Sequence, residues 1–223
     1  MSMIFVLMGA PGAGKGTQAD LLVEDVGFHK ISTGDALRRQ ISEQSEIGMK
    51  ASAFMKEGKL VPDDILLGVL KREVEDFKEK KILLDGYPRN LQQAETLERL
   101  GYGINGVIHI DVDRTELLGR LSGRRICGVC NISYHLHSKA PKKSGICDRC
   151  EGELLTRDDD TLSKVEVRLK VYENETAPVL EHYRNSDLYY RVDGGRDVDS
   201  VAKDVKQIIF NLSEPRQDRC HKR

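Results

Sequence analysis

Apolar residues along this chain alternate between short continuous runs and longer periodic stretches. The short runs occupy residues 3–8, 82–85, 107–112 and 188–192 and predict strands, since they are too brief for helices. Residues 28–31, Phe-His-Lys-Ile, are a further strand candidate with a less apolar pattern. Apolar positions at helical spacing predict helices that open at residue 18, include residues 37–41, and cover 48–57, 65–77, 91–100, 114–121, 161–183 and 198–212. This alternation predicts an α/β fold, with a parallel sheet covered by helices on both faces.

Residues 123–160 break the alternation, because they have no helical period and contain four cysteines. Cys127 and Cys130 form one C-x-x-C pair, and Cys147 and Cys150 form a second pair, with sixteen residues between the two pairs. Two such pairs facing each other predict a tetrahedral, structural zinc site. The metal would stabilise a ribbon, including Ser133–Leu136, that is too small to fold by core burial alone.

Two alternatives remain open for this segment. Two disulfides would use the same cysteines, although a reducing compartment disfavours them. A zinc ribbon that binds nucleic acid is the other alternative, but Tyr134 is the only aromatic residue in 123–160 that could stack on a base. Its basic residues would be Arg124, Arg125, Lys139, Lys142, Lys143 and Arg149.

The segment between the first predicted strand and the first predicted helix is Gly9-Ala10-Pro11-Gly12-Ala13-Gly14-Lys15-Gly16-Thr17. Its G-x-x-x-x-G-K pattern indicates a phosphate-binding loop, in which backbone N–H groups and a helix N-terminus attract an anion. Lys15 adds a full positive charge. Gly16 stands where the usual pattern has a hydroxyl for Mg²⁺, so we expect waters or a carboxylate elsewhere to hold the metal. An ordinary glycine-rich turn is the alternative.

Composition narrows the functional classes. The chain has 223 residues, of which 39% are hydrophobic and 32% charged, and its formal net charge of -1 argues against a general nucleic-acid binder. No apolar stretch approaches the roughly 20 residues of a membrane span. The N-terminus runs directly into the glycine loop, which favours a cytoplasmic protein without a signal peptide. We expect Cys220 to be a free thiol in a disordered tail, residues 213–223.

Six motifs together resemble those of the adenylate kinase family. They are residues 9–17, Ser32-Thr33-Gly34-Asp35, Gly58-Lys59-Leu60-Val61-Pro62-Asp63, Asp85-Gly86-Tyr87-Pro88-Arg89, Gly123-Arg124-Arg125 and Arg157-Asp158-Asp159-Asp160. The resemblance extends from Met3 to about Leu212, and residues 123–160 resemble the zinc-bearing lid of bacterial long-form members.

This resemblance implies the P-loop nucleoside monophosphate kinase fold, with a parallel five-stranded sheet and helices on both faces. Residues 1–31, 61–122 and 161–223 would form the core. Residues 32–60 would form an AMP-binding insert, and residues 123–160 the lid. Both inserts would close over bound nucleotides and expel water.

The resemblance also implies reversible phosphoryl transfer from Mg²⁺-bound ATP to AMP, giving two ADP. The residues are compatible with this chemistry. The acceptor phosphate is already ionised near neutral pH, so no general base is needed. The reaction instead requires positive groups that align two anions, which Lys15 and several arginines can supply.

Individual roles follow from the same resemblance. The ATP site would consist of Gly12, Ala13, Gly14, Lys15, Gly16, Thr17, Arg120, Arg124, Ser133, Tyr134 and Arg196. The AMP site would consist of Thr33, Arg38, Lys59, Leu60, Val61, Gly86, Tyr87, Pro88, Arg89, Gln93, Arg157 and Arg168. The catalytic groups would be Lys15, Arg89, Arg124, Arg157, Arg168 and Asp85, the last by orienting waters around Mg²⁺.

Finer expectations follow for a few of these residues. Arg196 would contact the ATP base through its backbone carbonyl, and Gln93 would hydrogen bond to the adenine of AMP. Asp159 and Asp160 would tie the lid down. Ala36 and Tyr87 depart from the family pattern without removing a charge.

Structural alternatives exist for several predicted site residues. Asp85 could be a turn carboxylate, Thr33 only a helix cap, and Arg120 or Arg168 an exposed helix residue. Gln92 could point inward in place of Gln93.

Two alternative functions also remain. A UMP or CMP kinase would share the glycine loop, although the long lid and Gln93 favour AMP. A zinc-ribbon binding module with a regulatory nucleotide loop is less compatible with the balanced charge. The expected partners are ATP, AMP and ADP, with no nucleic acid and no membrane, and the expected state is a monomer.

Overall fold

A five-stranded parallel sheet forms the centre of the molecule. The structure, a computed structural model, describes residues 3–77 and 80–213. The strands follow the order β2-β3-β1-β4-β8, and the predicted fold class is confirmed. They are β1 (Met3–Met8), β2 (His29–Ser32), β3 (Lys81–Asp85), β4 (Ile104–Asp111) and β8 (Tyr189–Asp193). Register aligns Leu7 and Ser32 with Asp85, so these chain segments leave the sheet at the same edge.

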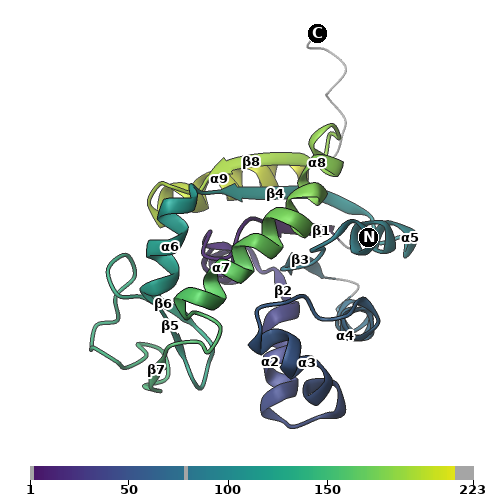
Figure 1. Cartoon of the computed structure of the whole chain (residues 1–223). Coiled ribbons are helices and arrows are strands. Elements are labelled where there is room, and N and C mark those ends of the chain that lie inside the picture. Colours follow the sequence, from purple (N-terminus) through teal and green to yellow (C-terminus); the bar gives the residue numbers. More distant parts are fainter. Residues whose placement is uncertain (1–2, 78–79, 214–223) are drawn as a thin grey trace.

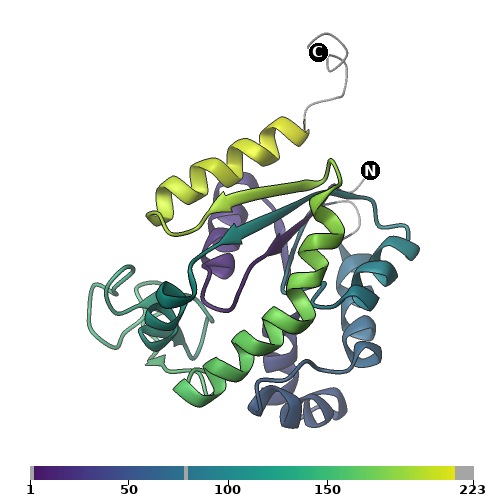
Figure 2. The same ribbon diagram turned by 45° about the horizontal axis from the view of Figure 1, so that its top comes forward.

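Helices cover both faces of this sheet (Figures 1 and 2). They are α1 (Lys15–Val26), α2 (Thr33–Ser42), α3 (Glu46–Lys56), α4 (Asp63–Asp76), α5 (Leu91–Arg99), α6 (Arg114–Ser122), α7 (Leu162–Val171), α8 (Ala177–Arg184) and α9 (Val198–Ser213). Phe5 and Leu7 pack with residues of α1 and α9 on one face. Ile4 and Val6 pack with residues of α4, α5 and α8 on the other. The central strand β1 is therefore apolar on both sides, as its continuous run predicted, whereas the edge strands β2 (HKIS) and β8 (YYRVD) include polar residues.

The predicted helix over residues 161–183 is wrong in one respect. A π-helix, η1 (Tyr172–Thr176), separates α7 from α8. Pro178 lies in the first turn of α8. It has no N–H, so it cannot donate the main-chain hydrogen bond that an uninterrupted helix needs at this position. The wider π-helical turn, η1, directly precedes α8. The spacing of apolar residues in 161–183 does not indicate that one extra residue is inserted into the helical repeat here. None of the described helices has both the length and the apolarity to cross a membrane.

Residues 124–155 form a second, antiparallel sheet in the order β6-β5-β7. Its strands are β5 (Arg124–Cys127), β6 (Ser133–His135) and β7 (Leu154–Leu155). The apolar cluster beneath it contains only Cys127, Tyr134 and Cys147, with Cys130, Ile132 and Leu154 at its margin. This sheet and helices α2 and α3 both project beyond the carboxyl ends of the main strands (Figure 1). Of the predicted disordered tail, Ser213 ends α9, and Cys220 lies outside the described residues.

Candidate active site

A cavity of about 940 Å³ lies at the carboxyl ends of the main strands. Its size is near the upper end of ordinary ligand pockets, so it can hold more than one small molecule. The glycine loop, α2, the β3–α5 connection, α6, the antiparallel sheet and α7 all contribute to its walls. All residues predicted for the ATP and AMP sites line this cavity, except Tyr87 and Gln93.

The glycine loop curves around one end of the cavity. Gly12 and Gly14 have positive φ angles of 87° and 94°, which a side chain disfavours. Helix α1 starts at Lys15 and has no side-chain cap, so its first N–H groups are available to an anion. The Lys15 Nζ donates hydrogen bonds to the carbonyl oxygens of Gly9 at 2.8 Å and Ala10 at 2.9 Å.

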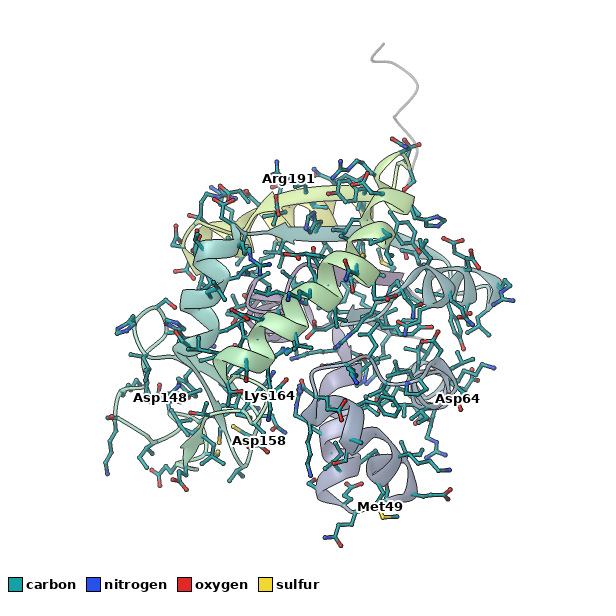
Figure 3. The ribbon with its side chains drawn as sticks, viewed as in Figure 1. Met49, Asp64, Asp148, Asp158, Lys164 and Arg191 are labelled. Carbon is teal, nitrogen blue, oxygen red and sulfur yellow. The ribbon has the colours of Figure 1, made fainter. Side chains whose placement is uncertain are left out.

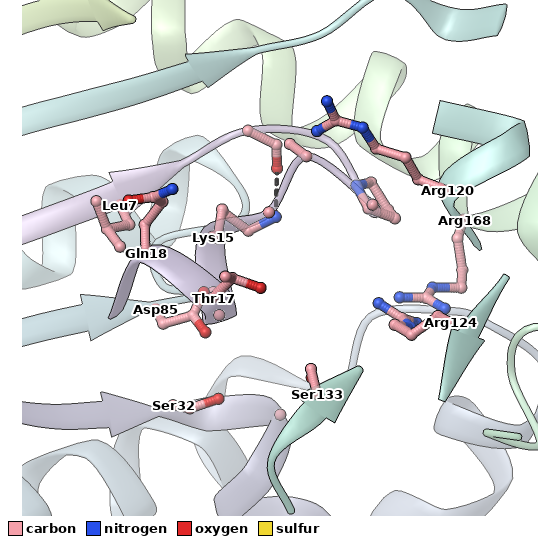
Figure 4. Close-up of a pocket in the computed structure, with 18 of the residues that line it drawn as sticks. Leu7, Lys15, Thr17, Gln18, Ser32, Asp85, Arg120, Arg124, Ser133 and Arg168 are labelled. Atoms are coloured by element: carbon pink, nitrogen blue, oxygen red, sulfur yellow. Dashed lines mark hydrogen bonds between the residues drawn. The ribbon is translucent and has the colours of Figure 1, made fainter. Parts of the chain in front are cut away.

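The charge of Lys15 depends on its surroundings. Burial lowers the pKa of its ammonium to about 8, with further lowering by Arg89, Arg168 and Arg124 and partial compensation by Asp85. The group is still largely charged at neutral pH. Figure 4 shows Lys15 and Asp85 on one side of the cavity and Arg124 and Arg168 on the other.

Asp85 ends β3 beside the start of α1. A Cβ placed on Gly16 would lie 3.9 Å from Asp85 Oδ2, so the carboxylate lies close to the position of the hydroxyl that Gly16 lacks. Carboxylate oxygen is a preferred ligand type for Mg²⁺, directly or through water. The residues present therefore fit a magnesium ion bound with a nucleotide.

A fully buried carboxylate holds two arginines side by side. Arg124 on β5 donates to Asp160 through Nε at 2.7 Å and also through Nη2. Arg168 on α7 donates to the same Asp160 at 2.8 Å and forms an ion pair with Asp159 at 3.0 Å. Asp160 thus links the antiparallel sheet to α7. Figure 3 shows Asp158 and Lys164 at the same junction.

Asp35 balances a second group of cations. Its carboxylate pairs with Arg38 at 2.5 Å, with Lys30 at 3.7 Å and with Arg157 at 3.9 Å. Although burial alone would raise it, Arg38, Lys30 and Arg157 lower the pKa of Asp35 to about 2. Burial, together with Arg38 and Arg124, lowers the pKa of Arg157 to about 9, so this guanidinium stays charged near neutral pH.

The Arg89 side chain folds back over its own loop. Its Nε donates to the carbonyl of Gly86 at 2.7 Å, and the hydroxyl of Thr33 donates to the same oxygen at 2.9 Å. A Cβ on Gly86 would lie 2.8 Å from Arg89 Nη2, so only glycine leaves room for this guanidinium. Ser32, and not Thr33, caps α2 by accepting from the N–H of Asp35, and the alternative of Thr33 as a cap alone is wrong.

Arg120 and Arg196 lie near the Gly194–Gly195 turn. Arg120 pairs with Glu116 and donates to the carbonyl of Gly194 at 2.7 Å. Since Arg120 and Arg168 both line the cavity, the alternative that they are merely exposed helix residues is wrong. The side chain of Arg196 pairs with Asp204. The predicted contact with the ATP base uses the backbone carbonyl of Arg196, so this ion pair does not interfere with it.

The four predicted zinc ligands come together in the antiparallel sheet. Their sulfur atoms all lie within 4.8 Å of one another, with 3.4 Å between Cys127 and Cys150 and 3.5 Å between Cys130 and Cys147. Tetrahedral zinc with Zn–S bonds of about 2.3 Å places sulfurs about 3.8 Å apart. Disulfides need about 2.05 Å. The cluster therefore fits zinc and not two disulfides.

Comparison with known proteins agrees with this geometry. The sequence model of the family described as "Adenylate kinase" matches residues 7–188. The adenylate kinase of Methanocella arvoryzae is 47% identical over 216 residues, which is 95% of this chain and all of that protein. Those of Bacillus velezensis and Bacillus subtilis are each 43% identical over 217 residues, with the same coverage.

The chain belongs to the adenylate kinase family. Membership confirms the predicted fold and the predicted enzyme class. It adds no role for any single residue of this kinase, so the predicted site residues remain predictions.

Gln93 and Tyr87 have a different environment from the other predicted AMP residues of this kinase. Gln93 is 1% exposed, and its Nε2 donates to Asp63 at 2.6 Å while its Oε1 accepts from the N–H of Arg89 at 2.7 Å. The Tyr87 hydroxyl donates to the carbonyl of Gln93 at 3.3 Å. Gln92 is exposed, so the alternative that it points inward is wrong. The predicted contact of Gln93 with a base stays a prediction.

Asp35 and Thr176 are among the cavity residues that the predicted ATP and AMP sites do not include. Asp35 was recognised only as the last residue of the Ser32–Asp35 motif, although a carboxylate three residues before Arg38 on a helix can pair with it. Thr176 lines the cavity and donates to the carbonyl of Arg89 at 2.7 Å. No signal in the sequence indicates that contact, because it depends on the π-helix.

Proposed function

We propose that this kinase binds ATP between the glycine loop and the antiparallel sheet, binds AMP between α2 and the Gly86–Arg89 loop, and transfers the γ-phosphoryl group between them to give two ADP. The observation that carries the proposal is the meeting of five cationic side chains from distant segments around one cavity: Lys15, Arg89, Arg124, Arg157 and Arg168. Phosphate oxygens are the groups that such a set recognises.

On the ATP side, the N–H groups of Gly12–Thr17 bind the phosphates and Lys15 neutralises the outer ones. Arg120 and Arg124 contact the nucleotide from the lid, with Ser133, Tyr134 and the backbone of Arg196 near the base. The position of Asp85 beside Gly16 supports its role in holding Mg²⁺. When bound, the ion neutralises phosphate charge during transfer.

On the AMP side, Thr33, Arg38 and residues 59–61 bind the nucleotide, and residues 86–89 hold its phosphate. A contact of Gln93 with the base, which the resemblance implies, would require its amide to leave Asp63 and the N–H of Arg89. Arg89, Arg157 and Arg168 align the acceptor phosphate with the γ-phosphoryl group. Arg157 pairs with Asp35, and Arg168 pairs with Asp159 and Asp160. These ion pairs support the roles of Arg157 and Arg168, because they keep buried guanidinium groups charged and fixed in place.

The acceptor oxygen of AMP needs no general base, since it is ionised near neutral pH. The protein acts by orienting two anions that repel each other and by presenting fixed positive charge to the transferring group. Closure of residues 123–160 and 32–60 over the core, residues 1–31, 61–122 and 161–223, excludes water as a competing acceptor. The separate apolar cluster around Tyr134 supports residues 123–160 as a unit, whereas the cluster around Leu37 and Ala51 also includes Val61 and Leu66 of the proposed core.

Zinc in the proposed lid is structural, with Cys127, Cys130, Cys147 and Cys150 as its four ligands. The kinase acts as a monomer in the cytoplasm, on small nucleotides, with no nucleic-acid or membrane partner. The balanced net charge of -1 and the four free cysteines support this.

A coupled assay tests the proposal. Purified protein with Mg²⁺, ATP and AMP should form two ADP per AMP consumed, and a blank without AMP should form almost none. Faster transfer to UMP or CMP would contradict AMP as the acceptor. Arg89→Ala should lower kcat/KM about 10²- to 10³-fold with unchanged thermal unfolding. Arg72→Ala, on the exposed side of α4, is the matched control and should match the wild-type rate.

A further inference from the structure

The main chain of Arg89 is fixed by side chains on both sides of the residue. Its N–H donates to Gln93 Oε1 at 2.7 Å, and its carbonyl accepts from Thr176 Oγ1 at 2.7 Å. Gln93 belongs to the helix that directly follows the loop, whereas Thr176 lies 87 residues away in sequence. Thr176 therefore makes a long-range contact that ties the Arg89 loop to the η1 segment.

The π-helix explains how Thr176 reaches this position. An α-helix turns about 100° per residue, so an uninterrupted helix would place residue 176 about 80° away from the face that carries Arg168. A π-turn absorbs one extra residue, which brings Thr176 to within about 20° of that face. Arg168 and Thr176 indeed both line the cavity. The continuous helical segment α7–η1 thus carries both Arg168 and the Thr176 hydroxyl, which contacts Arg89.

Arg89 has a particular need for such a restraint. Its guanidinium is buried near other cations: burial, Arg168 and Arg38 lower its pKa, with partial compensation by Asp85 and Asp159. Because charges of both signs surround the group, its action on a phosphate depends on a fixed position. The Nε contact with Gly86 holds the side chain relative to its own loop, at 2.7 Å. The Thr33 hydroxyl ties Gly86 in that loop to α2, and the Thr176 hydroxyl adds a contact at Arg89 itself.

We propose that Thr176 is a positioning residue of the transfer reaction, whose hydroxyl fixes the Arg89 carbonyl so that the guanidinium is aligned toward the transferring phosphoryl group. This inference rests on the proposed role of Arg89 at the AMP phosphate. Thr176 uses its hydroxyl on the protein, so it acts through Arg89 and not by binding nucleotide. Its side chain is nearly buried, at 8% exposure for the residue, so water is a poor substitute for the lost donor.

Thr176→Val tests this, because valine keeps the shape and removes the hydroxyl. We expect kcat/KM for AMP to fall about 10-fold, while KM for ATP stays unchanged, since an unsatisfied carbonyl lets the Arg89 loop shift. Thr176→Ser keeps the hydroxyl and should restore most of the activity. The matched control is Thr96→Val on α5, where the lost hydroxyl contacts only exposed Arg99. If Thr176→Val does not fold, Thr176→Ala removes the hydroxyl without adding a methyl group.

A double-mutant cycle separates positioning from plain stabilisation. In an Arg89→Ala background, Thr176→Val should change kcat/KM less than twofold, because the group it positions is gone. A lower melting temperature with wild-type kcat and KM at 25 °C, or an undiminished 10-fold loss in the Arg89→Ala background, would overturn the inference. Absence of ADP formation by the wild-type protein would instead overturn the proposed function, so the two failures are distinguishable.

Discussion

At the scale of single residues, the cavity is organised by carboxylates as much as by cations. Asp160 is fully buried and serves Arg124 and Arg168 at once, while Asp35 serves Arg38 and lies near Lys30 and Arg157. Burying a guanidinium costs several kcal/mol unless it is paired and hydrogen bonded. These carboxylates therefore let the fold assemble a phosphate site before a nucleotide neutralises it.

His109 predicts how stability depends on pH. It is 6% exposed on β4, its Nδ1 lies 2.8 Å from the Tyr189 hydroxyl, and its Nε2 lies 3.8 Å from Asp111. Burial, with smaller contributions from Arg191, Lys15 and Arg184, lowers the pKa of His109 to about 4 despite Asp111. Because the unfolded pKa is about 6.5, the unfolded chain binds the proton first as pH falls. The free energy of unfolding should drop by about 2 kcal/mol between pH 6.5 and 5 from this residue.

Urea unfolding at pH 7, 6 and 5 measures this loss. His109→Asn should reduce the pH dependence in that range, and His29 and His135, whose pKa values burial also lowers, should account for part of what remains. His182→Asn, which replaces a half-exposed imidazole paired with Glu98, should keep it. An equal slope for wild type and His109→Asn would contradict the assignment.

The residue types of the cavity could be predicted from motifs, but their pairing could not. The family resemblance predicted that Asp159 and Asp160 tie the lid down, yet nothing in the sequence indicates that Asp160 bridges two arginines. Gln93 is a similar case, because its hydrogen bonds to Arg89 and Asp63 depend on the course of three separate segments. Side-chain partners across long sequence separations follow from packing, which a single sequence does not display.

At the scale of elements, the antiparallel sheet is the least self-sufficient part of the fold. Its apolar cluster contains two of the four cysteines and one tyrosine as buried members. Backbone N–H groups of Val129 and Cys130 point at the Cys127 sulfur at 3.4 Å, an arrangement that favours thiolate. So small a cluster cannot offset the conformational entropy of β5–β7, and a bound metal can.

We therefore expect one zinc per chain. Removal by a chelator should lower the melting temperature by about 5–10 °C, since losing a few kcal/mol shifts a domain of this size by that amount. Cys150→Ser should lose the metal, whereas Ser144→Ala, an exposed change in the same loop, should retain it. Metal analysis and calorimetry provide the measurements. A metal-free protein of equal stability, with four thiols titrating freely, would show that zinc has no structural role.

Periodicity predicted the main elements because each follows one regular pattern over its whole length. Strand β1 and most of β3 are continuous apolar runs, and the helices repeat at their own spacing. The π-helix at Tyr172–Thr176 and the two-residue strand β7 have no such pattern. Both elements depend on tertiary contacts, so local sequence propensity does not predict them.

At the scale of the whole molecule, the parallel sheet explains why distant motifs converge. Each strand delivers its carboxyl end to the same edge, where ligands of open α/β sheets bind. The glycine loop follows β1, Thr33 follows β2, and Asp85 ends β3. The topology could be inferred from the order of elements, and with it the edge that holds the site. The orientation of the lid over that edge could not be inferred, since residues 123–160 have no periodic pattern to place them.

The contact between the proposed lid and the proposed core predicts the kinetics of the complete cycle. Asp160, the last residue of the proposed lid, binds Arg124 of the same segment and Arg168 of the proposed core. We therefore expect the buried Asp160–Arg168 pair to separate when the lid opens to release product. Transfer itself requires only small displacements within an assembled cavity. Lid opening should then be slower than transfer.

Rapid-quench measurements at enzyme concentrations near those of substrate should show a burst of ADP whose amount is comparable with that of the enzyme, followed by slower turnover. Asp160→Asn should weaken the contact and reduce the ratio of burst to steady-state rate, whereas Asp158→Asn makes the same charge change on an exposed neighbour and should leave it unaltered. Product formation that is linear from the first turnover would show that chemistry, and not opening, sets the rate.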